Sequence, residues 1–128
     1  MEKEDILIDT NIFIEHFRNN SKAVDFFESL EVSSNIYFSA ITETELLAGK
    51  SNNDSTKKRK LMLFLNQWRK IPADNPMVIL AGDISREYDV DVPDAIIAAT
   101  AMMNNLTLLT KNIKHFKKIK ELKVKSPY

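Results

Sequence analysis

The sequence contains no cysteine in 128 residues. Its absence excludes a disulfide framework and any thiolate metal site, and it agrees with a reducing compartment. No stretch rich in proline or glycine divides the chain. Apolar runs reach only about ten residues, whereas a membrane-spanning helix needs about 20. The first residues, MEKED, are acidic and polar, unlike a secretory signal peptide, so we expect a cytoplasmic protein with no membrane partner.

Several common catalytic signatures are missing as well. The chain has no glycine-rich phosphate-binding loop and no G-x-S-x-G motif of a serine hydrolase. Its two histidines, His16 and His115, are too few for a histidine zinc site and lack its spacing, so we expect both on the surface. The acidic residues are therefore the main candidates for chemistry.

Length and composition predict a single soluble globular domain over residues 1–128, because 44% of the residues are hydrophobic and 28% are charged. The formal net charge is zero, yet residues 1–50 carry a net charge of −6 and residues 111–128 a net charge of +6. An acidic front half and a basic tail can place a metal site beside a phosphate-attracting surface. The alternative for the tail is an ordinary solvated lysine-rich surface.

Hydrophobic patterns predict strands that alternate with helices. The expected strands cover residues 6–8, 36–38, a short segment around Ile71, 106–110 and 123–124. The expected helices cover residues 11–18, a segment capped by Ser21, 42–48, 56–68, 77–88 and 93–104. Elements that alternate in this way form a parallel sheet with helices on both faces, so we expect an α/β fold.

Three of these helices have informative sequences. The helix 93–104 is apolar on every side, which predicts that it is buried all round. In the helices near residues 23–30 and 61–68, apolar side chains form stripes that suit the core or, alternatively, a dimer contact. Residues 57–60 are all basic and stand at a helix start, where they oppose the helix dipole. Either an anionic partner or a solvated helix end accounts for them.

Asp9 directly follows the buried strand 6–8. Asp is a favoured N-cap residue, and the neighbouring Thr10 and Asn11 are also compatible with a cap. A metal ligand is the alternative, and the two roles are compatible because each carboxylate oxygen has two lone pairs. Glu45 has the same two interpretations, because Thr42 and Glu45 fit a capping box in which Thr42 is the N-cap, and a metal ligand is the alternative. Glu43 lies nearby on another side of the helix, and the periodicity does not choose between the two glutamates.

Asp94 opens the buried helix 93–104, just after a proline suited to the first helical position. The helix dipole favours an acid there, and this is the structural explanation. If the N-terminus of this helix is buried, however, its carboxylate loses contact with solvent, which costs free energy. A bound cation would offset that cost. Thr110 ends the strand 106–110 and Asn112 follows it, in a turn where Asn commonly makes local hydrogen bonds.

In these segments the sequence resembles a PIN-domain ribonuclease, specifically a VapC-like toxin of a toxin–antitoxin pair. The resemblance rests on ILIDTNIFIE, SAITETELLAG, VPDAIIAATA and LLTKNIKHF, in this order, and extends from Ile6 to about Phe116. Each segment is a weak signal by itself, whereas four in the right order within 128 residues are specific. The resemblance implies a three-layer α/β/α fold with a central parallel sheet of four or five strands.

The resemblance also implies the site. It places the family's catalytic positions on Asp9, Glu45, Asp94 and Asn112, with supporting residues Thr10, Asn11 and Thr110. The first three of these positions would hold Mg²⁺ or Mn²⁺. Many relatives have a further acid where this chain has His115, and Asn112 adds no negative charge, so a second ion is expected to bind more weakly.

The activity implied by the resemblance is cleavage of structured RNA, such as tRNA, by a metal-activated water. The implied partners are an antitoxin protein and a second copy of the chain. Basic residues that we expect to contact the RNA backbone are Lys57, Lys58, Arg59, Lys60, Lys111 and Lys114. Two other functions stay open: a non-catalytic nucleic-acid-binding or interaction module whose acids are helix caps, and a phosphatase or DNA nuclease that uses the same acids.

Overall fold

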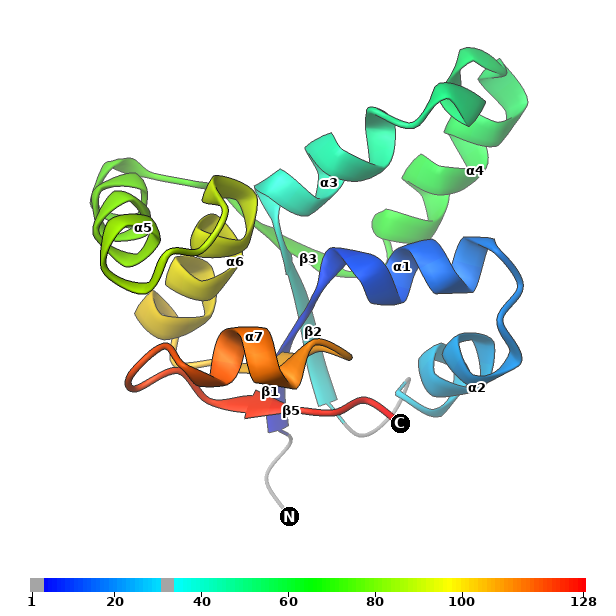
Figure 1. Cartoon of the computed structure of the whole chain (residues 1–128). Coiled ribbons are helices and arrows are strands. Elements are labelled where there is room, and N and C mark those ends of the chain that lie inside the picture. The colour runs from blue at the N-terminus through cyan, green and yellow to red at the C-terminus, as the bar shows by residue number, and fades with distance from the viewer. Residues whose placement is uncertain (1–3, 31–33) are drawn as a thin grey trace.

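The computed structural model describes residues 4–30 and 34–128, and its centre is a five-stranded sheet (Figure 1). The strands lie in the order β3-β2-β1-β4-β5, and every neighbouring pair is parallel. Their bounds are β1 Glu4–Ile8, β2 Ser34–Ser39, β3 Arg69–Ile71, β4 Thr107–Leu109 and β5 Val124–Lys125. Because β1 is central, residues that follow it lie at the middle of one sheet edge.

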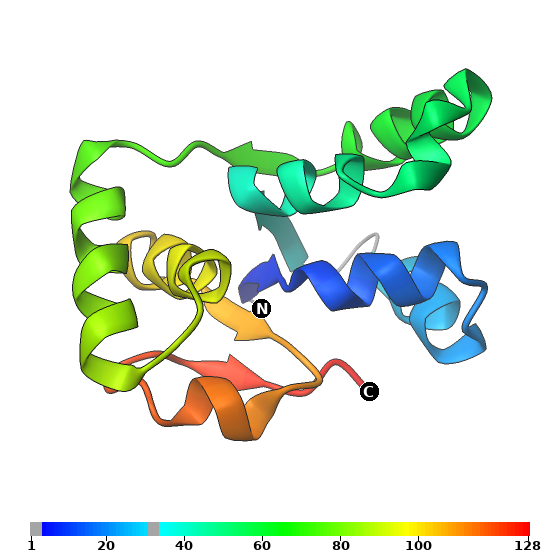
Figure 2. The same cartoon turned by 45° about the horizontal axis from the view of Figure 1, so that its top comes forward.

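Helices connect these strands and cover both faces of the sheet. The bounds of the helices are α1 Thr10–Phe17, α2 Ser21–Ser29, α3 Ala40–Leu47, α4 Ser55–Leu65, α5 Asn75–Tyr88, α6 Val92–Met103 and α7 Ile113–Lys117, with a short 3-10 helix η1 at Lys50–Asn53. Figure 2 shows α5, in green, on the side opposite α1, in blue. The predicted three-layer α/β/α fold is therefore confirmed, with five strands in the sheet.

Two hydrophobic cores fill the space between the layers. Successive side chains of a strand point to opposite faces, and β1 shows this directly: Leu7 packs with α5 and α6, whereas Ile6 and Ile8 pack with α1, α2 and α4. The predicted stripe on α4 belongs to the second core, because Leu61 and Leu65 are buried in it. This stripe is core and not a dimer contact.

Helix α6 is the most deeply buried helix segment, as its sequence predicts. Its buried residues are Ala95, Ile97, Ala98, Ala99, Thr100 and Ala101. Its exposed residues lie at its ends, where Val92 is 62% and Met103 is 45% exposed, and Ile96 is partly buried. No helix within residues 4–30 and 34–128 has the length and apolar character needed to cross a membrane.

The structure corrects two predicted helix starts. Asn20 caps α2, since its side-chain oxygen accepts from the N–H groups of Lys22 and Ala23, so Ser21 is the first residue of the helix and not its cap. Helix α3 begins at Ala40 with Ser39 as N-cap. Thr42 therefore lies inside the helix, and the predicted capping box of Thr42 and Glu45 is wrong.

Two leucines on α4 test the assignment of its inner face. Leu65 is 1% exposed and Leu63 is 59% exposed. We expect Leu65→Ala to lower the free energy of unfolding by about 2–5 kcal/mol, because it leaves a cavity in the core. The matched control Leu63→Ala should change it by less than about 0.5 kcal/mol. Urea unfolding measures both, and equal effects would contradict the packing described here.

Candidate active site

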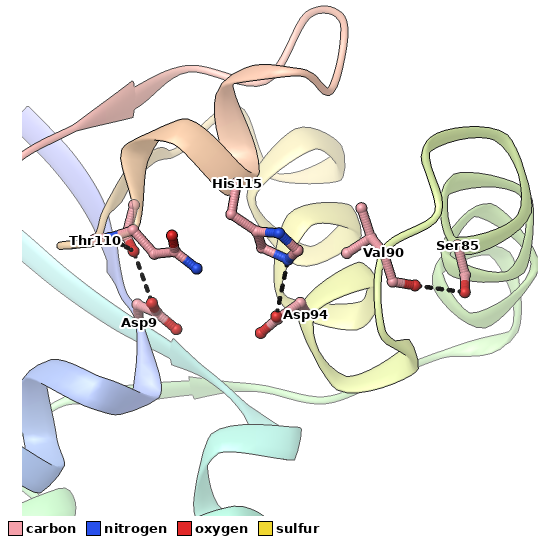
Figure 3. A network of polar contacts seen from close by, with 7 residues as sticks. Asp9, Ser85, Val90, Asp94, Thr110 and His115 are labelled. Carbon is pink, nitrogen blue, oxygen red and sulfur yellow. Dashed lines mark hydrogen bonds and ion pairs between the residues drawn. The ribbon is translucent and has the colours of Figure 1, made fainter.

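Strands β1 and β4 bring Asp9 and Thr110 together. The two strands pair in parallel with Ile8 opposite Leu109, so the next residue of each strand leaves the sheet at the same edge. The Asp9 backbone N–H donates to the Leu109 carbonyl at 3.0 Å. The Thr110 hydroxyl donates to Oδ2 of Asp9 at 2.7 Å (Figure 3). The strand register therefore fixes the position of the Asp9 carboxylate.

Asp9 is a buried carboxylate whose side chain does not cap a helix. It occupies the N-cap position of α1, but its side chain makes no capping hydrogen bond, so the capping interpretation is wrong. Only 3% of the residue is exposed. Burial raises the pKa of Asp9 to about 6; the Thr110 hydrogen bond lowers it, and the negative charges of Asp94 and Glu45 raise it further. Both other predicted acids are thus near enough to act on Asp9.

Glu45 joins the site through the residue that follows Asp9. The Thr10 hydroxyl donates to Oε1 of Glu45 at 2.8 Å, and its oxygen lies 2.9 Å from the Thr42 hydroxyl oxygen. Glu43, two residues earlier on α3, instead forms an ion pair with Lys70 at 2.9 Å. The structure therefore distinguishes the two glutamates, which the sequence periodicity does not, and places Glu45 at the Asp9 end of the sheet.

Asp94 lies in the first turn of α6 and contacts His115 from α7. Nε2 of His115 lies 3.1 Å from Oδ2 of Asp94, and the two side chains are 25% and 31% exposed, respectively. Burial raises the pKa of Asp94, while the neighbouring His115 lowers it. His115, predicted to be a surface residue, is partly exposed but is not free, because it pairs with Asp94. His16 is not a free surface residue either, because its ring stacks on Phe64 with the centroids 4.2 Å apart.

The connection between α5 and α6 holds the start of α6 in place. Asp89 ends α5 in the left-handed conformation, with φ of 54°. The Ser85 hydroxyl then donates to the Val90 carbonyl at 2.7 Å (Figure 3), and Val90 is buried. These contacts anchor the chain just before Asp94, which favours a fixed position for its carboxylate.

The fourth predicted position, Asn112, lies beside Thr110. Its backbone N–H donates to the Thr110 hydroxyl oxygen at 2.9 Å, which leaves the Thr110 proton for Asp9. The Asn112 side chain makes no capping hydrogen bond although the residue stands at the N-cap of α7. Asn11, the other predicted amide, is exposed on α1. Among the described residues, neither the Asn11 nor the Asn112 side chain makes a hydrogen bond that would indicate its role in the site.

A groove with a volume of about 720 Å³ opens beside Glu45, between α1, α3 and α4. Three basic side chains line it together with Glu45: Arg18, Lys57 and Lys60. Among the described residues, Lys58 and Arg59 do not belong to its lining. Half of the predicted basic run therefore lines a concave surface that also includes Glu45, which a merely solvated helix end would not require.

The two predicted lysines after β4 differ in their surroundings. Lys111 donates to the Tyr128 carbonyl at 3.3 Å, and its ammonium lies 4.6 Å from the centre of the Tyr128 ring. Lys114 is exposed on α7. Lys114 is thus the freer of the two for an external anion, while Lys111 ties the loop after β4 to the end of the chain.

The donor chemistry of this site fits a hard divalent cation. Within residues 4–30 and 34–128, no three Asp, Glu or His side chains come close enough together to form a complete ligand set. Mg²⁺ does not require one, because it keeps several waters and is commonly bound by one or two carboxylates. Asp9 is buried, and among the described residues no cationic side chain pairs with it. A bound cation would offset the cost of this buried charge.

Comparison with known proteins identifies the family. The family model described as PIN domain matches residues 6–122. The chain belongs to the PIN-domain family. Ribonuclease VapC10 from Mycobacterium tuberculosis is 30% identical over 123 residues, which cover 92% of this chain and 90% of that protein. The predicted resemblance to VapC-like PIN domains is therefore confirmed.

Solved structures of PIN-domain relatives have the same fold. A chain of a toxin–antitoxin complex from Klebsiella pneumoniae aligns with a TM-score of 0.80 at 29% identity and covers 96% of this chain and 98% of that one. A chain of VapBC2 from Rickettsia felis, solved with a DNA fragment from the VapBC2 promoter, aligns with a TM-score of 0.81 at 26% identity. The alignment covers 95% of this chain and 98% of that one.

The raised pKa of Asp9 predicts how stability depends on pH in the metal-free protein. Because the folded-state pKa of Asp9, about 6, exceeds the ordinary value of 3.8 for an aspartic acid, the folded protein retains, between these two pH values, a proton that the unfolded chain has released. Ionisation of the buried group therefore destabilises the fold as pH rises from 4 to 7. Relative to Asp9→Asn, the wild type should lose up to about 3 kcal/mol of unfolding free energy.

Urea unfolding in EDTA at several pH values measures this difference. Asn at position 9 can still accept the hydrogen bond from Thr110, so Asp9→Asn removes the titration with little change in shape. A difference between the two proteins that stays constant from pH 4 to 7 would show that Asp9 is not a buried carboxylate with a raised pKa.

Proposed function

We propose that this PIN-domain protein is a metal-dependent endoribonuclease that acts as the toxin of a toxin–antitoxin pair. The observation that carries the proposal is the Asp9 carboxylate, which is 3% exposed and feels the charges of Asp94 and Glu45. A fold does not gain stability by gathering acids around a buried carboxylate. A site that binds a divalent cation accounts for this arrangement.

Asp9, Asp94 and Glu45 would hold Mg²⁺ or Mn²⁺ between them, directly or through the waters that such an ion keeps. When bound, the ion supplies a nucleophilic water at neutral pH and neutralises charge on the phosphate. The chain's own hydroxyl groups orient the ligands: Thr110 donates to Oδ2 of Asp9 and Thr10 to Oε1 of Glu45. Each carboxylate has further lone pairs that a cation can use.

The groove beside Glu45 supports RNA as the substrate. Arg18, Lys57 and Lys60 line it, and cations spaced along a groove bind a phosphate backbone without reading its sequence. Relatives of similar length are named ribonucleases. We infer that a structured RNA, such as a tRNA, places its backbone along this groove with the cleaved phosphate at the acids.

Antitoxin binding is the proposed means of control. The Klebsiella pneumoniae relative was solved as a toxin–antitoxin complex, and a partner that inserts a basic side chain among the carboxylates would compete with the metal. We also propose a homodimer. Its candidate surface includes the exposed apolar residues Val78 and Ile79 on α5, which are 46% and 67% exposed.

Two glutamates on α3 provide a matched test of the acidic site. We expect Glu45→Gln and Asp94→Asn each to lower the rate of RNA cleavage by at least about 100-fold, because groups that merely support metal ligands already contribute 10–100-fold. Glu43→Gln should retain activity, since Glu43 pairs with Lys70 outside the site. Cleavage is assayed on tRNA in Mg²⁺ or Mn²⁺, with circular dichroism to confirm folding.

The same assay separates the other functions. Equal activity on single-stranded DNA or on a small phosphomonoester would indicate a DNA nuclease or a phosphatase. Full cleavage by folded Asp94→Asn would contradict the proposed site. Metal-free binding of RNA without any cleavage would favour a non-catalytic module.

The groove makes a separate prediction about salt dependence. Replacing Lys57 and Lys60 together by Ala should weaken RNA binding and reduce the slope of log K against log salt by about 1 for each lost phosphate contact. Arg59→Ala is the control, because Arg59 lies on the same helix and is exposed but does not line the groove. Filter binding at several salt concentrations measures the slopes. An equal loss for Arg59→Ala would place the RNA elsewhere on α4.

A further inference from the structure

His115 brings an imidazole next to the acids of the site. It lies on α7, 21 residues from Asp94 in sequence, and its ring points from α7 to Asp94 (Figure 3). The atom that faces the carboxylate is Nε2, at 3.1 Å from Oδ2. Both side chains remain partly exposed, at 25% and 31%. An ion from solvent can therefore reach the two atoms without unfolding the site.

The two atoms form a hydrogen bond or ion pair in the structure, and their spacing is also compatible with two neighbouring ligands of one ion. Around an octahedral cation with bonds of about 2.1 Å, neighbouring ligand atoms lie about 3.0 Å apart. The measured separation between Nε2 and Oδ2 is 3.1 Å. A cation that binds Asp94 on the side of Oδ2 would thus find the imidazole nitrogen at a distance suited to coordination, with only small side-chain movements.

Nitrogen and oxygen ligands favour different ions. Mg²⁺ prefers oxygen ligands and demands regular geometry, whereas imidazole is a good ligand for divalent transition metals. A site made only of carboxylates would accept Mg²⁺ readily. A site that offers an imidazole nitrogen beside one carboxylate should bind a transition metal more tightly than Mg²⁺, because Mg²⁺ gains little affinity from a nitrogen ligand.

We propose that His115 binds the catalytic cation together with Asp94 and that this nitrogen ligand makes the site select a divalent transition metal, such as Mn²⁺, over Mg²⁺. The proposal rests on the metal-dependent function proposed above and names the ion that this function uses. The role needs the neutral ring, with Nε2 free to donate its lone pair to the metal.

Mn²⁺ binding to the metal-free protein tests this proposal without an activity assay. The protein is prepared without a polyhistidine tag, so that its only imidazoles are those of His16 and His115. Electron paramagnetic resonance of free Mn²⁺ gives its dissociation constant, and competition gives that of Mg²⁺. Pulsed measurements on bound Mn²⁺ detect ¹⁴N coupling from a coordinated imidazole.

We expect the wild type to bind Mn²⁺ more tightly than Mg²⁺ and to show ¹⁴N coupling. His115→Asn should abolish the coupling and weaken Mn²⁺ binding by at least about tenfold, the lower end of what supporting groups contribute. His115→Asp should abolish the coupling yet bind Mg²⁺ more tightly than the wild type, because it replaces nitrogen by a carboxylate. His16→Gln is the matched control and should retain the coupling.

The outcomes separate this inference from the function on which it rests. If Mn²⁺ and Mg²⁺ do not bind the wild type, both the metal-dependent function and the role of His115 are wrong. If Mn²⁺ binds without ¹⁴N coupling, the cation site stands and His115 is not a ligand. That conclusion holds even if His115→Asn weakens binding, because His115 would then only orient Asp94 through their hydrogen bond. Circular dichroism melts of both His115 variants exclude unfolding as the cause of a loss.

Discussion

The hydrogen bond from Thr110 to Asp9 is the contact on which the site depends. It joins the ends of two adjacent parallel strands, residues 101 positions apart, at 2.7 Å. It orients a carboxylate that burial otherwise keeps from ionising at its usual pH. The protein thus maintains a destabilising group in a fixed position, and the cation proposed to bind there would offset the free-energy cost of burying it.

The fold explains why the other acids reach the same edge of the sheet. Parallel strands present their carboxyl ends at one edge of the sheet, and helices begin there. Glu45 arrives on α3 after β2 and is oriented by Thr10, the residue next to Asp9. Asp94 arrives at the start of α6, whose apolar body is held in the core beside β1 and β4. The groove lined by Glu45 and three basic side chains runs beside α4, so the proposed RNA and cation would meet near Glu45.

The hydrophobic pattern predicts the strand–helix alternation, since it depends on local periodicity. It does not predict the start of α3, because Thr42 and Glu45 have capping-box spacing whether the helix begins at Thr42 or two residues earlier. The length of β2, which ends at Ser39, decides that question. The contact of His115 with Asp94 has no local signal in the sequence either, because the short helix α7 creates it. Asp9 is different, because its place directly after a buried strand makes it a candidate in the sequence, as a helix cap or as a metal ligand, and the structure contradicts the cap.

A crystal of the metal-free protein soaked in Mn²⁺ would test the central claim most directly, namely that the buried carboxylate at the end of β1 belongs to a cation site. Anomalous scattering locates Mn²⁺ independently of any assumption about its ligands. The account predicts a strong peak between the carboxylates of Asp9 and Asp94. Peaks confined to other acidic residues, with no density near Asp9 at saturating Mn²⁺, would contradict it.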